Sequence, residues 1–132
     1  MATLKAVSSP QIQRALQFLK QGGLVAFPTD TLYGLGADAL NDGAVERVLR
    51  AKGRPVALGL PLLLAEVEDM EEYASAVPAL AWRLARAFWP GPLTLVLPRS
   101  SQVHDLIAGG RPTVALRVPD HLVPRALAAG LG

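Results

Sequence analysis

The stretch GLVAFPTDTLYGLGADA, residues 23–39, begins like a buried strand and then becomes polar. Its apolar run at 24–27 predicts a strand, because short apolar runs bounded by turn residues are typical of strands. The polar side chains that follow are two hydroxyls, a carboxylate and a phenol, from Thr29, Asp30, Thr31 and Tyr33. Thr29 and Asp30 fit an Asx or ST turn that ends the strand, which leaves open what the other polar groups do.

Strand patterns alternate with helical patterns along the rest of the chain, which indicates an α/β layer architecture in a single domain of 132 residues. The connection between residues 98 and 113 is too irregular for a regular crossover, so the sheet is predicted to be mixed rather than parallel. The strands of this one twisted sheet are expected at 24–27, 60–65, 93–98 and 113–119.

Helix boundaries are marked by capping residues. Ser9 and Pro10 fit the N-cap and first position of a helix that ends before Gly22, and Asn41 can cap a helix that runs to about Ala51. The other helices are expected in the acidic segment after residue 65, from Pro78 with Leu80, Leu84 and Phe88 facing inward, and at 120–129.

The composition describes a globular protein, with 51% hydrophobic and 18% charged residues. The chain has no cysteine, which excludes disulfides and thiolate metal sites and fits a reducing compartment. The first residues lack the apolar core of a signal peptide, and the longest apolar run, LGLPLLLA, is too short to cross a bilayer. We therefore expect a cytoplasmic protein without a membrane partner.

The net charge of +2 conceals an uneven distribution. Five of the 11 acidic residues lie at 66–72, and no Lys or Arg occurs between Arg54 and Arg83. The 13 basic residues elsewhere face only six acidic ones, which indicates a positive surface for phosphates or RNA, unless the charges form two ordinary solvated faces.

Common catalytic motifs are absent from the sequence. GLGADA at 34–39 matches the dinucleotide fingerprint, but the residues after it break a helix, and no P-loop occurs. His104 and His121 have no cysteine beside them, so they do not indicate a metal site, and Ser100 and Ser101 near His104 do not make a triad by proximity alone. An enzyme with this sequence would work mainly by holding charged reactants.

Basic residues at element ends are better candidates. Lys52 and Arg54 flank Gly53 at the end of a predicted helix, where they could hold phosphate or carboxylate oxygens or simply stabilise the helix C-terminus. Arg117 lies in an apolar strand, so it needs an anionic partner from the protein or from a ligand.

Four motifs, PTDTLYGLG, AKGRP, FWPGPLTLVL and VALRVPDH, occur in this order from about Gly22 onward. Together they resemble the YrdC-like family of threonylcarbamoyl-adenylate synthases. The resemblance implies a twisted mixed α/β sheet with flanking helices and a concave, positively charged surface. It also implies a nucleotidyltransferase that joins L-threonine, bicarbonate and ATP, releases pyrophosphate, and serves the threonylcarbamoyladenosine modification of tRNA together with other tRNA-modification proteins.

The resemblance also implies roles for single residues. Thr29, Thr31 and Tyr33 are expected in the wall of a threonine pocket, with Arg117 directed at the threonine carboxylate.

Lys52 and Arg54 match the catalytic Lys-x-Arg pair at the ATP phosphates and the bicarbonate-derived carboxylate, and Thr113 matches a nucleotide contact. Residues 89–94 are expected to give structural support. Magnesium is expected through the phosphates of ATP, without protein ligands.

Two departures from the family pattern concern the residues that are expected to contact ATP. Leu58 stands where many relatives have a basic or amide residue. The chain stops at Gly132, before a Thr-Ser-Ala-Asn type motif, so it is expected to lack the family's C-terminal portion. We expect it either to form a homo-oligomer through an exposed strand edge or to bind ATP weakly.

Two other functions remain open at this stage. One is a module that binds double-stranded RNA or tRNA without synthase activity. The other is a related domain that makes carbamoyl-adenylate for metal-centre maturation.

Overall fold

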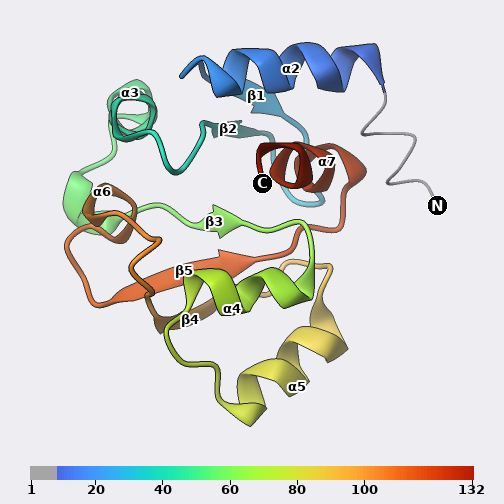
Figure 1. The fold of residues 1–132 in the computed structure, drawn as a ribbon, viewed down its shortest axis with the longest axis vertical. Helices are drawn as coiled ribbons and strands as arrows, with labels where there is room; N and C mark the ends of the chain where they lie inside the picture. Colours follow the sequence, from blue (N-terminus) through green and yellow to red (C-terminus); the bar gives the residue numbers. More distant parts are fainter. Residues whose placement is uncertain (1–8) are drawn as a thin grey trace.

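The structure is a computed structural model and describes residues 9–132. Figure 1 shows a sheet in the middle of the molecule, with helices on either side. The helices and strands are α2 (Pro10–Lys20), β1 (Val25–Phe27), β2 (Gly34–Gly36), α3 (Asp42–Lys52), β3 (Leu62–Leu63), α4 (Met70–Tyr73), α5 (Ala79–Phe88), β4 (Leu95–Pro98), α6 (Asp105–Ala108), β5 (Thr113–Arg117) and α7 (Leu122–Leu131), with short 3-10 turns at Val56–Leu58 and Val67–Asp69.

The central strand is β5, which lies between β3 and β4. β3 pairs with it in parallel and β4 in antiparallel orientation, so the predicted mixed sheet is confirmed. Leu116 pairs with Leu62 on one side and Leu95 on the other, and it is 0% exposed. Alternate residues of β4 and β5 face the same core, as the period of two in a strand requires.

The strand at 24–27 does not join this sheet, contrary to our prediction. It forms β1, which pairs only with β2 in an antiparallel hairpin that the sequence did not indicate. The ring of Phe27 lies over Gly34 and Gly36, and a Cβ on Gly36 would come within 2.7 Å of that ring. The two glycines therefore leave room for the Phe27 ring to pack against β2.

The terminal helices of the described chain, α2 and α7, pack against each other and against β1 (Figure 1). Ile12, Leu16 and Leu19 are buried on one face of α2, as the sequence predicts. They meet Ala126 and Leu127 of α7 in a core separate from that of the mixed sheet. Among residues 9–132, no helix has both the length and the apolar composition needed to cross a membrane.

The ends of α3 follow the capping rules. The Asn41 side chain accepts a hydrogen bond from the backbone N–H of Ala44, and Gly53 ends the helix in the left-handed region with φ of +60°. A residue with a Cβ is strained in that region, so glycine suits the position. This confirms the predicted helix from Asn41.

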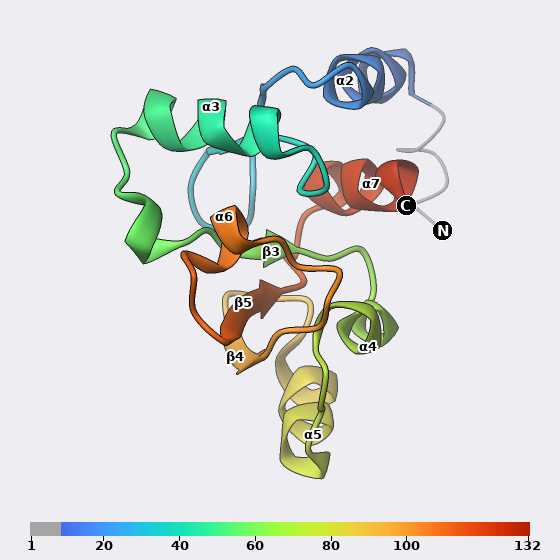
Figure 2. The same ribbon diagram turned by 60° about the vertical axis from the view of Figure 1, so that its left-hand side comes forward.

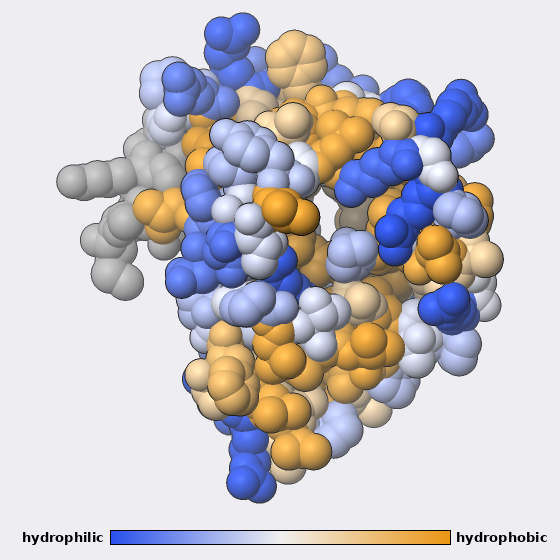
Figure 3. All heavy atoms as spheres, turned by 180° about the vertical axis from the view of Figure 1, so that it is seen from behind, coloured by the Kyte–Doolittle hydropathy of each residue, from blue (hydrophilic) through white to orange (hydrophobic). Residues whose placement is uncertain are grey.

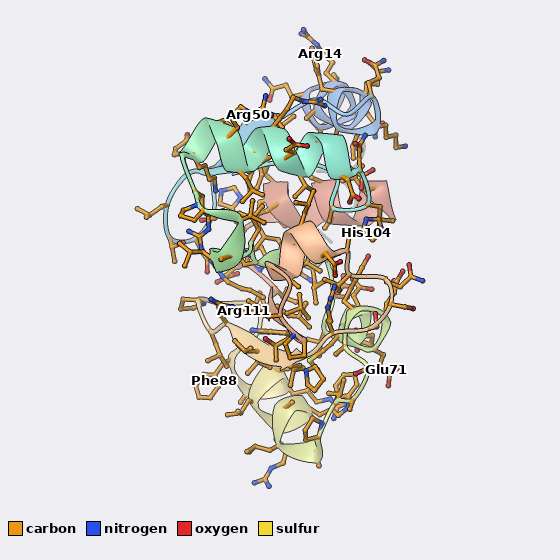
Figure 4. The ribbon with its side chains drawn as sticks, turned by 90° about the vertical axis from the view of Figure 1, so that its left-hand side faces the viewer. Arg14, Arg50, Glu71, Phe88, His104 and Arg111 are labelled. Carbon is orange, nitrogen blue, oxygen red and sulfur yellow. The ribbon has the colours of Figure 1, made fainter. Side chains whose placement is uncertain are left out.

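The predicted inward face of α5 is right for Leu84, which is partly buried against the core, and wrong for Leu80 and Phe88. Leu80 is 61% and Phe88 57% exposed, whereas the buried residues are Ala81 and Ala85, in register with buried Trp89. The Nε1–H of Trp89 donates to the Leu93 carbonyl at 2.7 Å, which fixes the ring in the core and sets the phase of the helix. Figure 2 shows α5 extending from the end of the molecule opposite to α2, and Figure 4 shows Phe88 at the edge of the molecule.

Two further segments differ from the sequence-based expectation. Only Leu62–Leu63 of the run at 60–65 is a strand, and the segment between β4 and β5 contains the short helix α6. Both differences reflect tertiary contacts. The backbone N–H of Leu60 bonds to Ile107 of α6 rather than to a neighbouring strand.

Replacing Leu116 by Ala should lower the free energy of unfolding by about 3 kcal/mol, because it opens a cavity beneath the central strand. The matched variant Leu80→Ala should stay within about 0.5 kcal/mol of wild type, since the side chain is mostly in solvent. Urea unfolding of the two variants measures both values. Equal losses would contradict the phase of α5 described above.

Candidate functional site

A cavity of about 660 Å³ lies between the β1–β2 hairpin and the mixed sheet. β2 lines one side of it, the segment at 60–66 that contains β3 lines the other, and the end of α7 contributes a third wall. Its walls are largely apolar, and Figure 3 shows the opening from the face opposite to Figure 1.

Residues singled out in the sequence line this cavity, although they come from distant parts of the chain. Three belong to the loop between β1 and β2, one ends α3 and one ends β5. They are Thr29, Thr31, Tyr33, Lys52 and Arg117.

The loop at 28–33 is organised by Thr29. Its hydroxyl accepts a hydrogen bond from the backbone N–H of Thr31 at 3.1 Å and donates to the Leu32 carbonyl at 2.5 Å. The ST turn considered for this loop is therefore present. The loop also exposes Tyr33, which is 81% accessible at the mouth of the cavity.

Arg117 is held from three directions. Its Nε–H donates to the carbonyl of Gly91 at 2.9 Å, its Nη2 group donates to the carboxylate of Asp30, and its Nη1 lies 3.5 Å from the Thr31 hydroxyl. The side chains of Arg117 and Asp30 are each 13% exposed. The sequence predicted an anionic partner for this arginine, and the protein itself supplies one.

Lys52 and Arg54 lie on either side of the left-handed Gly53. Lys52, the last residue of α3, is exposed and lines the cavity. Arg54 is not among the lining residues, and its Nε–H donates to the Gly59 carbonyl at 2.8 Å. A Cβ on Gly59 would lie 2.6 Å from the Ile107 carbonyl, so glycine is required where it accepts this bond.

The other nucleotide candidates lie outside the cavity lining. Thr113 is half-buried at the start of β5, opposite Pro98 of β4. Leu58 is exposed in the 3-10 turn Val56–Leu58.

No acidic group was placed in the site from the sequence, and neither was Tyr73. Asp38, Glu66, Asp69, Glu72 and Tyr73 all line the cavity. The run of acidic residues at 66–72 was a signal for three of these residues. Burial raises the pKa of the Tyr73 phenol above its ordinary value of 10.0, and the nearby carboxylates of Glu72, Asp69 and Asp38 raise it further. The cavity therefore has cationic and anionic parts.

The two histidines serve as local contacts. His104 Nδ1 lies 2.6 Å from the Asp42 carboxylate, and this contact links α6 to α3. Figure 4 labels His104. His121 Nδ1 accepts from the backbone N–H of Val123 at the start of α7. Within residues 9–132, no cluster of three or more potential metal-ligating side chains is present.

Several known proteins are similar to this chain. A family model for Sua5, YciO and YrdC, described as "Telomere recombination", matches residues 17–132. A threonylcarbamoyl-AMP synthase of Pyrococcus abyssi is 51% identical over 111 residues, which are 84% of this chain and 33% of that protein. A protein of the same name from Halorhodospira halophila is 43% identical over 122 residues, which are 92% of this chain and 64% of that protein. The chain thus spans less than two thirds of the length of either relative.

Solved structures give the same picture of the fold. The crystal structure of P. abyssi Sua5 complexed with L-threonine matches with a TM-score of 0.85 at 48% identity, covering 92% of this chain and 36% of that one. The crystal structure of E. coli YciO matches with a TM-score of 0.84 at 28% identity, covering 92% and 59%. The YrdC-like α/β fold expected from the sequence is thereby confirmed.

The raised pKa of Tyr73 makes stability depend on alkaline pH. Below pH 10 both folded and unfolded chains keep the phenolic proton. As pH rises further, the unfolded chain loses it first, so the free energy of unfolding falls until the folded phenol also ionises. Tyr73→Phe should remove this part of the decline. Urea unfolding between pH 8 and 11, followed by tryptophan fluorescence, measures it, and parallel curves for the two proteins would contradict the shift.

Proposed function

Because this chain belongs to the Sua5, YciO and YrdC family, we propose that it makes threonylcarbamoyl-adenylate from L-threonine, bicarbonate and ATP and releases pyrophosphate. The threonylcarbamoyl group would then pass to tRNA through other tRNA-modification proteins, in the cytoplasm. Relatives named threonylcarbamoyl-AMP synthase support the reaction, and the P. abyssi Sua5 complex with L-threonine supports the substrate.

The observation that carries the proposal is the meeting of three family motifs at one cavity. Thr31 of PTDTLYGLG, Lys52 of AKGRP and Arg117 of VALRVPDH all line it. Hydroxyl groups and a guanidinium suit a small amino acid with its own hydroxyl and carboxylate. A solvated lysine suits an anion that arrives from water.

Catalysis in this proposal rests on positioning and on charge. The threonine amine attacks carbon dioxide derived from bicarbonate, forms a C–N bond and loses a proton, which yields a carbamate. A carbamate oxygen then attacks the α-phosphorus of ATP, and the bond to pyrophosphate breaks. The threonine carboxylate, the carbamate and the ATP phosphates are all anionic, so cations that hold them close together lower the barrier.

Lys52 and Arg54 take the phosphate and carbamate oxygens in this scheme, and Thr113 contacts the nucleotide. Arg54 already donates its Nε–H to Gly59, which leaves its terminal nitrogens as donors for a ligand. Magnesium would enter as part of the ATP substrate and be held through the phosphates, since residues 9–132 offer no cluster of ligands for it.

RNA binding is the second candidate, and the exposed cations favour it. Arg50, Lys52 and Arg54 are all exposed at the end of α3, and Figure 4 shows Arg50 on the outer side of that helix. Such a group can contact a phosphate backbone, and binding of this kind weakens steeply with salt. Salt-dependent binding of double-stranded RNA or tRNA without threonine binding would favour this module over the synthase.

Replacing Lys52 by Ala should lower threonine-dependent and bicarbonate-dependent pyrophosphate release by about 100-fold, because one charge that neutralises the transition state is lost. A pyrophosphate assay at saturating ATP and threonine measures the rate.

Arg50→Ala is the matched control. Arg50 lies on the same helix end, its side chain is 75% exposed and pairs with Glu46, and it does not line the cavity. Its loss should change the rate less than about twofold, since an exposed i,i+4 pair contributes little. Equal losses of rate in the two variants would contradict a specific role of Lys52 in the reaction.

A further inference from the structure

Asp30 contacts Arg117 but does not line the cavity itself. Its neighbours Thr29 and Thr31 line the cavity, and so does Arg117. Its carboxylate accepts from Arg117 Nη2, and both side chains are mostly buried. The acid is therefore not part of the cavity wall, so a ligand in the cavity can approach Arg117 without displacing it.

The other two nitrogen donors of Arg117, Nε and Nη1, differ in how well they are hydrogen-bonded. Nε is held by the Gly91 carbonyl at 2.9 Å, whereas Nη1 has only the Thr31 hydroxyl at 3.5 Å, which is long for a hydrogen bond. Thr31 is a cavity residue, so the least committed donor lies on the cavity side. Arg117 can thus offer Nη1 to a ligand oxygen while Asp30 stays in place.

The two cations of the cavity differ in how far a neighbouring carboxylate compensates their charge. Arg117 is neutralised by Asp30, so it offers directional N–H groups with little net charge. Lys52 has no carboxylate within ion-pair distance among the described residues, so no ion pair offsets its charge. An anion is attracted to Lys52 much more than to Arg117.

We propose that Asp30 is a positioning residue that makes the Arg117 end of the cavity selective for a zwitterionic amino acid over simple anions. The inference rests on the proposed function, in which threonine binds beside Arg117. Threonine carries an ammonium group, which an uncompensated guanidinium would repel. Asp30 removes that repulsion and also lowers the attraction for bicarbonate or phosphate, so the two substrates are directed to different ends of the cavity.

The substitution Asp30→Asn separates charge from geometry. Asparagine has nearly the same size and keeps an amide oxygen that can accept from Arg117, but it carries no charge. The probes are L-threonine, a zwitterion, and N-acetyl-L-threonine, which has the same side chain and carboxylate but no ammonium group. Calorimetric titration gives the Kd of each probe for each protein.

Wild type should bind threonine more tightly than the acetylated anion. In Asp30→Asn the affinity for N-acetyl-L-threonine relative to that for threonine should rise about tenfold. The reason is that the positive charge of Arg117 is no longer compensated by a carboxylate. High salt should reduce the shift, since the added attraction is electrostatic.

Asp105→Asn is the matched control. It removes the carboxylate of another arginine pair, with Arg99 at 2.6 Å, that does not line the cavity. The Kd ratio should stay within twofold of wild type. A tenfold shift in this variant would show that the ratio reports total charge and would overturn the assignment to Asp30.

The outcomes separate the two proposals. A wild-type chain that binds no threonine contradicts the proposed function. A wild-type chain that binds threonine, with an unchanged ratio in Asp30→Asn, contradicts the role of Asp30 alone. If the asparagine variant does not fold, Asp30→Glu keeps the charge and should hold the ratio within twofold, whereas a tenfold shift would overturn the inference.

Discussion

The guanidinium of Arg117 is the group on which the arrangement of the site depends. It ends the most central strand, where a charged group is costly unless it is paired and hydrogen-bonded. Its acceptors come from segments far away in the chain, since Gly91 is 26 and Asp30 is 87 residues distant. The hairpin loop, the turn after α5 and β5 therefore meet at one side chain. The cavity lies between hairpin and sheet, so its shape depends on the same contact.

The turn after α5 contributes to the candidate site by holding Arg117. Gly91 accepts from Arg117 and donates its own N–H to the Val118 carbonyl at 2.9 Å, so it is joined to the end of β5 twice. A Cβ on Gly91 would lie 2.5 Å from the Phe88 carbonyl, which excludes larger residues. Buried Trp89 holds the preceding residues in the core. Structural support, expected for residues 89–94 from the sequence, thus includes the orientation of a site residue.

The sequence predicts those elements whose pattern is local and strong. The apolar stripe of α2, the Asn41 cap of α3 and the mixed sheet follow from spacing and capping. The strand β2 could not be predicted this way, because Gly34 and Gly36 have low strand propensity and pair only where Phe27 covers them. The predicted inward face of α5 was wrong at Leu80 and Phe88 for a similar reason. Leucines normally indicate the buried face, but here small alanines bring the helix close to the core.

The site shows the same division between local pattern and tertiary contact. Residue type and motif order identified five side chains that line the cavity, and burial in an apolar strand showed that Arg117 needs an anion. Neither signal could identify Asp30 as the partner of Arg117, because the two residues are far apart in the sequence and meet only in the folded chain. This matters for chemistry, since an arginine paired with a carboxylate and a lysine without an ion pair among residues 9–132 present different local charges to a ligand. The electrostatic character of the cavity is thus a property of the pairings around each cation, and it appears only when the distant segments are brought together.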